Sequence, residues 1–325
     1  MILVTGGAGY IGSVAAERLL ERGFEVCVYD SLFRGHRDAV PAAAEFVEGD
    51  VADRQRLRRV FRDYPIRSVM HFAALAEVGE SMQDAAGYFR NNVGAALALL
   101  EETQAADVER FVFSSTCAVF GDRNPSPISE EATADPISPY GESKWMVERT
   151  LRWYRQVHGL SYFALRYFNA SGATAERGER HDPESHLIPL VLEAAAGERE
   201  AIRVYGSDYP TPDGTCVRDY IHVLDLADAH IATLEAPAEL SGSYNVGTGR
   251  GHSVREVIDT VRRVTGRAVN EAAVARRPGD AAMLVADPSR IQAKLGWKAQ
   301  FSLEDAVRSA WEFRVRLAGA PARSS

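Results

Sequence analysis

Cysteine is scarce in this sequence, and long apolar runs are missing. The three cysteines, Cys27, Cys117 and Cys216, are far apart and show no metal-ligand spacing. This pattern argues against a disulfide framework and favours buried free thiols in a reducing compartment. No apolar run approaches the ~18 residues of a membrane helix, and residues 1–5 enter a strand pattern without the features of a signal peptide. We therefore expect a cytoplasmic protein with no membrane partner.

Positive charge is also in short supply. Lysine and arginine total 37 against 45 aspartates and glutamates, which gives a formal net charge of −8. Without a basic stripe to neutralise a phosphate backbone, we expect no nucleic-acid partner. A small anionic ligand remains possible, because it needs only a few well-placed arginines. The length of 325 residues, with 46% hydrophobic and 25% charged residues, is typical of a globular protein of roughly two domains or one large one.

The first residues follow the order strand, glycine turn, helix. An apolar run at residues 1–4 precedes Gly6, Gly9 and Gly12, and residues 13–22 then have helical periodicity. Glycines let the backbone approach a pyrophosphate closely, and the helix N-terminus offers free N–H groups to it. In this context the Gly-x-x-Gly-x-x-Gly spacing predicts a dinucleotide-binding loop.

An acidic residue ends the next predicted strand. Residues 24–29 form that strand and Asp30 follows it. A carboxylate at this place can accept hydrogen bonds from the adenosine ribose and repel a 2′-phosphate, which favours NAD over NADP. Arg34 and Arg37 lie nearby and weaken the preference slightly.

Further short strands alternate with helices and predict a doubly wound parallel α/β sheet. In such a sheet ligands bind beyond the carboxyl ends of the strands. Residues suited to a ligand stand at three of these ends: Asp50 and Val51 can reach an adenine edge, Ala73 and Ala74 leave room for a cofactor, and Thr116 supplies a hydroxyl. The predicted strands are residues 45–47, 67–72, 110–115 and 161–168, with a helix at 91–106.

A tyrosine and a lysine four residues apart begin the helix predicted after a loop at residues 122–139. Pro139 suits the first helical position and Ser138 can cap it, so Tyr140 and Lys144 should share one face of the opening turns. We expect the lysine ammonium to lower the tyrosine pKa from ~10 by roughly one to three units, making Tyr140 a general base near neutral pH. Because this spacing also occurs in ordinary surface helices, the interpretation depends on its context.

The regular alternation ends after Asn169, which we interpret as the chain leaving the sheet to build a cap and then returning. Residues 171–186 are predicted as loop, 187–196 as helix, 202–205 as strand, 225–234 as helix and 244–247 as strand. The predicted division is a dinucleotide-binding Rossmann domain at 1–169, revisited by about 217–250, a smaller C-terminal α/β substrate domain at 170–216 and 251–317, and a flexible tail at 318–325.

Histidines and carboxylates gather in the loop at residues 171–186. His181, Asp182, Glu184 and His186 are metal-ligand types, but their spacing matches no familiar metal site. We therefore expect no metal. We expect His71, inside a strand, to be a satisfied core residue.

Three motifs together resemble the extended short-chain dehydrogenase/reductase family and, within it, the epimerases that act at C4 of UDP-hexoses. The motifs TGGAGYIGS at residues 5–13 and SPYGESK at 138–144 are typical of the superfamily, and GSDYPTPDGTCVRDYIHV at 206–223 is much more specific to the epimerases. The similarity extends from Met1 to about Trp311. It implies NAD-dependent interconversion of UDP-galactose and UDP-glucose through a 4-keto intermediate. It also implies a homodimer formed through helices near residues 91–106 and 140–157.

The resemblance implies roles for individual residues. Tyr140 would take the proton of the sugar 4-hydroxyl, Lys144 would hold the nicotinamide ribose, and Thr116 would complete the catalytic set. Arg218 and Arg277 would hold the diphosphate, and Asp280 would meet the uridine ribose. The full predicted cofactor set is Gly6, Gly9, Tyr10, Ile11, Gly12, Asp30, Ser31, Asp50, Val51, Phe72, Ala73, Ala74, Asn91, Ser114, Tyr140, Lys144 and Tyr167. The substrate set is Thr116, Tyr140, Asn169, His186, Leu187, Val204, Tyr205, Arg218, Arg277, Asp280 and Leu284.

The chain departs from the family at three positions. Ala76 stands where many members have a lysine on the cofactor phosphates, so NAD is expected to be held less firmly. His186 replaces an asparagine of the substrate pocket. Leu284 stands where a tyrosine restricts some members to unacetylated sugars, which predicts some activity on UDP-GlcNAc and UDP-GalNAc.

Other functions on the same fold are less well supported. A dehydratase of the family would carry Asp-Glu where this chain has Cys117 and Ala118, so elimination is disfavoured. A non-catalytic NAD-binding scaffold would be expected to lose one of the three catalytic residues, and all are present. An epimerase of another nucleotide sugar, a uronic acid or a pentose, remains open.

Overall fold

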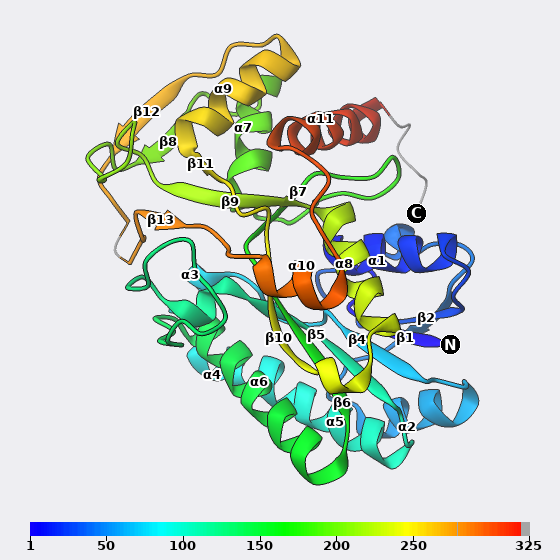
Figure 1. Cartoon of the computed structure of the whole chain (residues 1–325). Coiled ribbons are helices and arrows are strands. Elements are labelled where there is room, and N and C mark those ends of the chain that lie inside the picture. The colour runs from blue at the N-terminus through cyan, green and yellow to red at the C-terminus, as the bar shows by residue number, and fades with distance from the viewer. Residues whose placement is uncertain (278, 320–325) are drawn as a thin grey trace.

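The computed structural model describes residues 1–277 and 279–319 and contains one large sheet covered by helices on both faces (Figure 1). The seven strands run parallel in the order β10-β6-β5-β4-β1-β2-β3, which is the order of a doubly wound sheet. The predicted fold class is therefore confirmed. The strands are β1 (Ile2–Thr5), β2 (Val26–Asp30), β3 (Glu45–Glu48), β4 (Ser68–His71), β5 (Arg110–Thr116), β6 (Ser161–Tyr167) and β10 (Gly242–Val246).

Two layers of helices enclose this sheet because alternate strand residues point to opposite faces. Val4 packs into a core with helices α1 and α8, whereas Leu3 packs into a second core with α2, α5 and α6. Figure 1 shows α1 and α8 on one side of the sheet and α5 and α6 on the other. The helices of this part are α1 (Tyr10–Glu21), α2 (Arg54–Asp63), α3 (Val78–Ser81), α4 (Ala85–Tyr88), α5 (Ala95–Ala105), α6 (Pro139–His158) and α8 (Val223–Glu235), with a π-helical turn η2 (Phe89–Gly94) and 3-10 turns η1 (Arg37–Ala39), η3 (Cys117–Phe120) and η4 (Ala238–Leu240).

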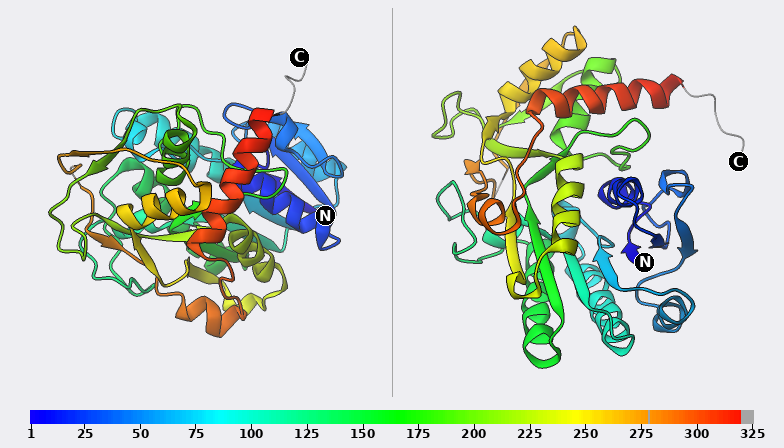
Figure 2. Two further views of the ribbon diagram at one scale, coloured as in Figure 1. Left: turned by 90° about the horizontal axis from the view of Figure 1, so that it is seen from above. Right: turned by 45° about the vertical axis from the view of Figure 1, so that its right-hand side comes forward.

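A C-terminal lobe stands on the carboxyl ends of the strands. Figure 2 shows its yellow helix α9 and red helix α11 at the end of the molecule remote from most of the green helix α6. Its own core joins α7, α9 and α11. The lobe contains a four-stranded sheet of β7 (Asn169–Ser171), β9 (Val217–His222), β11 (Gly251–Ser253) and β13 (Met283–Leu284), a strand pair of β8 (Ile202–Tyr205) and β12 (Glu271–Val274), and helices α7 (Leu187–Ala196), α9 (Val254–Thr265) and α11 (Leu303–Gly319).

The chain returns from this lobe to the large sheet before its end. Helix α8 packs on α1, β10 pairs in parallel with β6, and α10 (Ser289–Leu295) packs beside β10. The predicted boundaries between two domains stay a prediction. The predicted flexible tail begins inside α11, which continues to Gly319, and residues 320–325 lie outside the described residues. Among the described helices, none has the length and apolarity needed to cross a membrane.

Candidate active site

A cleft of about 1670 Å³ lies between the carboxyl ends of the parallel strands and the C-terminal lobe. Single-ligand pockets span about 300–1,000 Å³, so this cleft has room for two ligands side by side. The residues predicted to bind cofactor or substrate all line it except Val204. The Val204 side chain is buried in the core of the C-terminal lobe instead, where it packs with residues of α7 and α9.

The glycine loop follows β1 at the point where the strand order reverses. Gly6 has a φ of 74°, which favours glycine, and a Cβ atom on Gly12 would lie 2.2 Å from the Gly6 carbonyl oxygen. Helix α1 begins at Tyr10 with Gly9 as its N-cap, and no side chain caps it. Its first N–H groups therefore stay available to an anion. This tightly folded loop is suited to a dinucleotide pyrophosphate.

Asp30 is held against the glycine loop by backbone donors. Its Oδ2 accepts from the Ala8 N–H at 2.9 Å and its Oδ1 from the Leu32 N–H at 2.8 Å. The carboxylate lines the cleft and still has unused lone pairs. The fit of these groups to an adenosine ribose agrees with the predicted cofactor.

Helix α6 brings the predicted catalytic pair to the cleft. The Ser138 hydroxyl accepts from the Gly141 N–H at 3.2 Å and Pro139 is the first helical residue, so the predicted cap is confirmed. Lys144 is only 3% exposed and its Nζ donates to the Ser114 carbonyl oxygen at 2.9 Å. The same Nζ lies 5.9 Å from the centroid of the Tyr140 ring. Both side chains thus face the end of β5.

The pKa values of this pair overturn one prediction. Burial raises the pKa of Tyr140 to about 12, although a hydrogen bond with Thr116 acts in the opposite direction. Burial also lowers the pKa of Lys144 to about 7. The prediction that Lys144 lowers the tyrosine pKa is wrong for the protein without ligands, because the same burial that disfavours the phenolate also disfavours the ammonium.

Arginines mark the far end of the cleft. Arg218 donates to the carbonyl oxygens of Val217 and Ala281 at 2.9 and 2.8 Å and lies 3.5 Å from an Asp280 oxygen. The Arg277 guanidinium stacks on the Tyr205 ring at 3.8 Å from its centroid. Two oriented guanidinium groups in one wall can receive a diphosphate.

Residues 172–186, which we call the strap, form a side wall of the cleft and tie the C-terminal lobe to the large sheet. The Tyr10 hydroxyl donates to the Gly172 carbonyl oxygen at 2.6 Å. Arg177 pairs with Glu17 and donates to the Ala39 carbonyl oxygen at 2.7 Å. Arg180 pairs with Asp38 at 2.6 Å. These contacts fasten the strap beside the glycine loop and Asp30.

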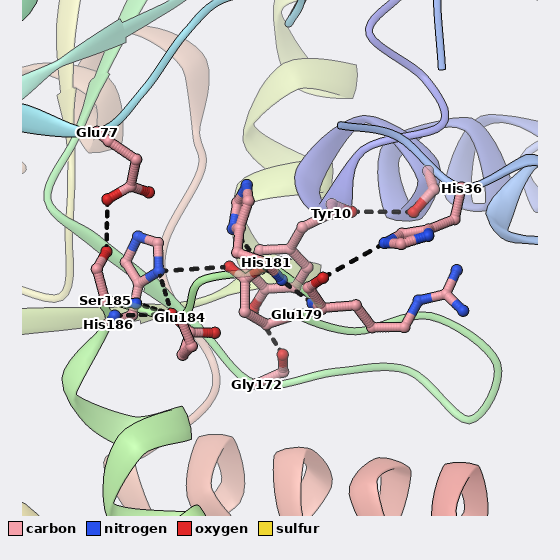
Figure 3. A network of polar contacts seen from close by, with 11 residues as sticks. Tyr10, His36, Glu77, Gly172, Glu179, His181, Glu184, Ser185 and His186 are labelled. Atoms are coloured by element: carbon pink, nitrogen blue, oxygen red, sulfur yellow. Dashed lines mark hydrogen bonds and ion pairs between the residues drawn. The ribbon is translucent and has the colours of Figure 1, made fainter. Parts of the chain in front are cut away.

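The end of the strap carries the network of polar contacts in Figure 3. His181 pairs with Glu179 at 2.5 Å and His186 with Glu184 at 2.8 Å. Burial alone would lower the pKa of His186, but the hydrogen bond to Glu184 and the charge of Glu179 raise it to about 9. A cationic imidazole therefore lines the cleft where the family resemblance implied a neutral asparagine.

Glu77 and Glu179 belong to this network and were missed in the sequence. The Ser185 hydroxyl donates to Glu77 at 2.6 Å, which joins the strap to the chain segment after β4. The position of Glu77 shortly after a buried strand was a usable signal, whereas nothing in the sequence places Glu179 beside two histidines. Ligand-type atoms of Glu77, His181 and His186 lie within 4.8 Å of one another, and the prediction that no metal binds stays a prediction.

The chain belongs to the NAD-dependent epimerase/dehydratase family, whose model matches residues 2–247. It is 50% identical to the UDP-glucose 4-epimerase of Streptomyces lividans over 96% of this chain and 95% of that one. The crystal structure of UDP-glucose 4-epimerase from Brucella ovis in complex with NAD has a TM-score of 0.92 at 47% identity, covering 96% of this chain and 98% of that one. The enzyme of the same name from Stenotrophomonas maltophila, with bound NAD and formylated UDP-arabinopyranose, has a TM-score of 0.93 at 40% identity and covers 98% of each chain.

Proposed function

We propose that the protein interconverts UDP-galactose and UDP-glucose with NAD as cofactor. The observation that carries the proposal is the meeting of Thr116, Tyr140 and Lys144 at the end of β5, in a cleft large enough for a dinucleotide and a nucleotide sugar together. The family and the full-length relatives named UDP-glucose 4-epimerase support it.

The glycine loop and Asp30 would hold the dinucleotide, and Arg218 with Arg277 would hold the diphosphate of the sugar nucleotide. When bound, oxidised NAD supplies a hydride acceptor and a positive charge beside the active site. The Tyr140 oxygen would accept the proton of the 4-hydroxyl and return it to the 4-keto oxygen after the hexose has turned over. Thr116 would hydrogen-bond the same oxygen.

The pKa values of Tyr140 and Lys144 determine which of the two carries a proton when the reaction begins. With a pKa of about 12 in the unliganded cleft, Tyr140 holds its proton at neutral pH and must release it before it can accept the proton of the 4-hydroxyl. To accept a proton it needs positive charge nearby. Lys144, with a pKa of about 7, is close to half charged at that pH, so a modest gain of negative charge around it makes it the required cation.

The sugar must be gripped by its nucleotide and left free to rotate. The arginines would grip the nucleotide, and Leu284, which lines the same cleft opposite Arg218 in the β9–β13 pair, is apolar and offers no side-chain hydrogen bond to the sugar. We therefore extend the proposal to UDP-GlcNAc and UDP-GalNAc, since leucine leaves more room than tyrosine for an N-acetyl group. Failure to turn over either compound under conditions that convert UDP-galactose would remove this extension.

The deciding experiment is conversion of UDP-galactose by purified protein, with and without added NAD. Turnover without addition means that the cofactor copurifies despite Ala76, and turnover only with NAD means weak retention. Tyr140→Phe is expected to abolish turnover and to leave NAD and UDP binding unchanged. A fully active Tyr140→Phe variant contradicts the assigned role, and an inactive wild type under both conditions redirects the search to UDP-uronates and UDP-pentoses.

We further propose a homodimer that forms through α5 and α6. Trp153 is 61% exposed and Val157 is 65% exposed on α6, with Leu97 and Met146 also exposed on this pair of helices. Large apolar side chains gathered on one face of a molecule favour a partner surface. A twofold axis beside the two helices would cover them.

The proposed location is the cytoplasm. The cysteines Cys27, Cys117 and Cys216 are unpaired, which fits a reducing compartment. Fractionation of the source cells tests this location directly.

A further inference from the structure

A carboxylate lies buried under the catalytic pair, in a cluster that the proposed reaction does not use. The Glu148 side chain is 1% exposed and pairs with Arg166, which is 5% exposed. Their atoms form three contacts of 2.7, 3.0 and 3.2 Å. Glu148 also accepts from the hydroxyls of Ser115 and Ser243, the latter at 2.6 Å. One carboxylate thus joins α6 to three strands, β5, β6 and β10.

The cluster is placed where it can set the geometry of the active site. Tyr140, Lys144 and Glu148 follow one another at four-residue spacing on α6 and therefore share a face. On β5, Ser115 lies between Thr116 and Ser114, whose carbonyl oxygen accepts the hydrogen bond from Lys144. The bond from Ser115 to Glu148 consequently ties the strand that carries Thr116 to the helix that carries Tyr140.

The N-terminal turn of α6 also contacts the end of β5. A Cβ atom on Gly141 would lie 2.6 Å from the Ala118 carbonyl oxygen, so the first turn of α6 rests directly on the turn after Thr116. The Thr116 hydroxyl itself accepts from the Ala118 N–H at 3.1 Å. Backbone contact at one end and the Glu148 cluster at the other thus hold α6 against the end of β5.

Stability alone does not account for a buried ion pair at this place. Taking two charges out of water costs about as much as their attraction returns, and well-packed apolar residues often serve equally well. A positional role fits better, because displacement of a catalytic group by about 1 Å can lower a rate by roughly a hundredfold. We propose that Glu148 is a positioning residue that fixes Tyr140 and Lys144 relative to Thr116 through Ser115. The proposal rests on the proposed function.

Two serine variants separate positioning from stability. Ser115→Ala and Ser243→Ala each remove one hydroxyl donor to the same carboxylate, but only Ser115 stands on the strand of Thr116. Both should lower Tm, Ser243→Ala by less because Ser243 is only partly buried. Ser115→Ala should reduce kcat on UDP-galactose by about tenfold or more with unchanged KM and bound NAD, and Ser243→Ala should stay within about twofold of wild type. Equal losses of kcat in the two variants, or a Ser115→Ala effect confined to KM, would overturn the proposal.

A second readout does not depend on any substrate. The sequence has only three lysines, Lys144, Lys294 and Lys298, so lysine-selective isotope labelling allows Lys144 to be titrated by NMR, with Lys144→Met for assignment. The Lys144 titration should shift in Ser115→Ala and not in Ser243→Ala. If the wild type is inactive on UDP-galactose but the Lys144 titrations of the two variants differ, the substrate assignment is refuted and the positioning role of Glu148 stands. If the Lys144 titration is identical in both variants, the positioning role is refuted whatever the substrate is.

Discussion

Replacing Lys144 by methionine is expected to stabilise the cofactor-free protein, and the gain should shrink as the pH rises. Burial lowers the pKa of Lys144 from 10.5 to about 7. The unfolded chain therefore binds more protons than the folded one between these two values, and the free energy of unfolding of the wild type rises with pH across that window. Below pH 7 the full cost of the buried ammonium is present, and above 10.5 it has vanished.

The magnitude follows from the size of the pKa change. Each unit corresponds to about 1.4 kcal/mol, so the charge term removed by Lys144→Met is about 5 kcal/mol at pH 6.5 and ~1 kcal/mol at pH 9.5. The substitution also leaves the Ser114 carbonyl oxygen without its donor, which costs about 1–3 kcal/mol. That cost is the same at both pH values. The quantity to test is therefore the change of roughly 3–4 kcal/mol between them.

Urea unfolding of the cofactor-free wild type and variant at the two pH values measures this difference. Lys298→Met, at an exposed position, is the matched control for the loss of a lysine as such. A stability difference between wild type and Lys144→Met that stays constant from pH 6.5 to 9.5 would refute the inference that Lys144 pays a charge penalty in the empty cleft. The variant should also be inactive, so a stabilised and inactive protein would display a trade-off between stability and function.

Three further outcomes are expected. Combining Arg177→Ala with Arg180→Ala removes two ion pairs of the strap and should speed the loss of bound NAD on dialysis by roughly tenfold. The control Arg308→Ala removes an exposed ion pair on α11 and should leave the rate of NAD loss unchanged. Equal rates in the two variants would mean that the strap does not limit NAD release. His186→Asn should destabilise the protein by no more than about 1 kcal/mol because the ring is partly exposed. Since the pKa of His186 in the folded protein is raised to about 9, this loss of stability should be full below pH 6.5 and absent above pH 9. Thermal melts of wild type and variant across this range measure it, and the opposite pH trend would contradict the ion pair with Glu184. Trp153→Arg should shift the mass measured by light scattering from that of a dimer to that of a monomer. Phe33→Arg, at another exposed aromatic residue, should leave the mass unchanged. A Trp153→Arg protein that is still dimeric would exclude the proposed interface.

Local signals in the sequence predicted much of the dinucleotide half of the site. The glycine spacing lay between a strand and a helix, and Asp30 ended the next strand, so chain order alone brought them together. Ser138 and Pro139 likewise marked the start of α6, because capping depends on neighbouring residues. The core position of His71 was also correct: its Nδ1 meets the Thr5 hydroxyl at 2.7 Å, and burial lowers the histidine pKa to about 3.

Tertiary properties were beyond the reach of the same reasoning. Helix α2 was not predicted, because of its ten residues only Leu57 and Val60 are buried and most of the others are arginine. Helix α9 was also missed, although Ser253 and Glu256 form a capping box that an explicit search would have found. The pKa error at Tyr140 arose because spacing on a helix reveals which charges are close but not how much water they lose. Val204 was placed by family position, and its burial depends on α7 and α9 packing over it.

The late return of the chain to the large sheet has a consequence for folding during synthesis. Strand β6 pairs with β5 on one edge, but its other edge waits for β10, from Phe163 beside Gly242 to Tyr167 beside Val246. While a nascent chain has not yet been synthesised as far as Val246, one edge of β6 has no partner strand. Such an open edge can pair with other chains. Closing it requires contact across a long stretch of sequence, and such contacts form slowly. The same strand delivers Ser243 to Glu148, so the ion-pair cluster is completed only when the sheet is closed.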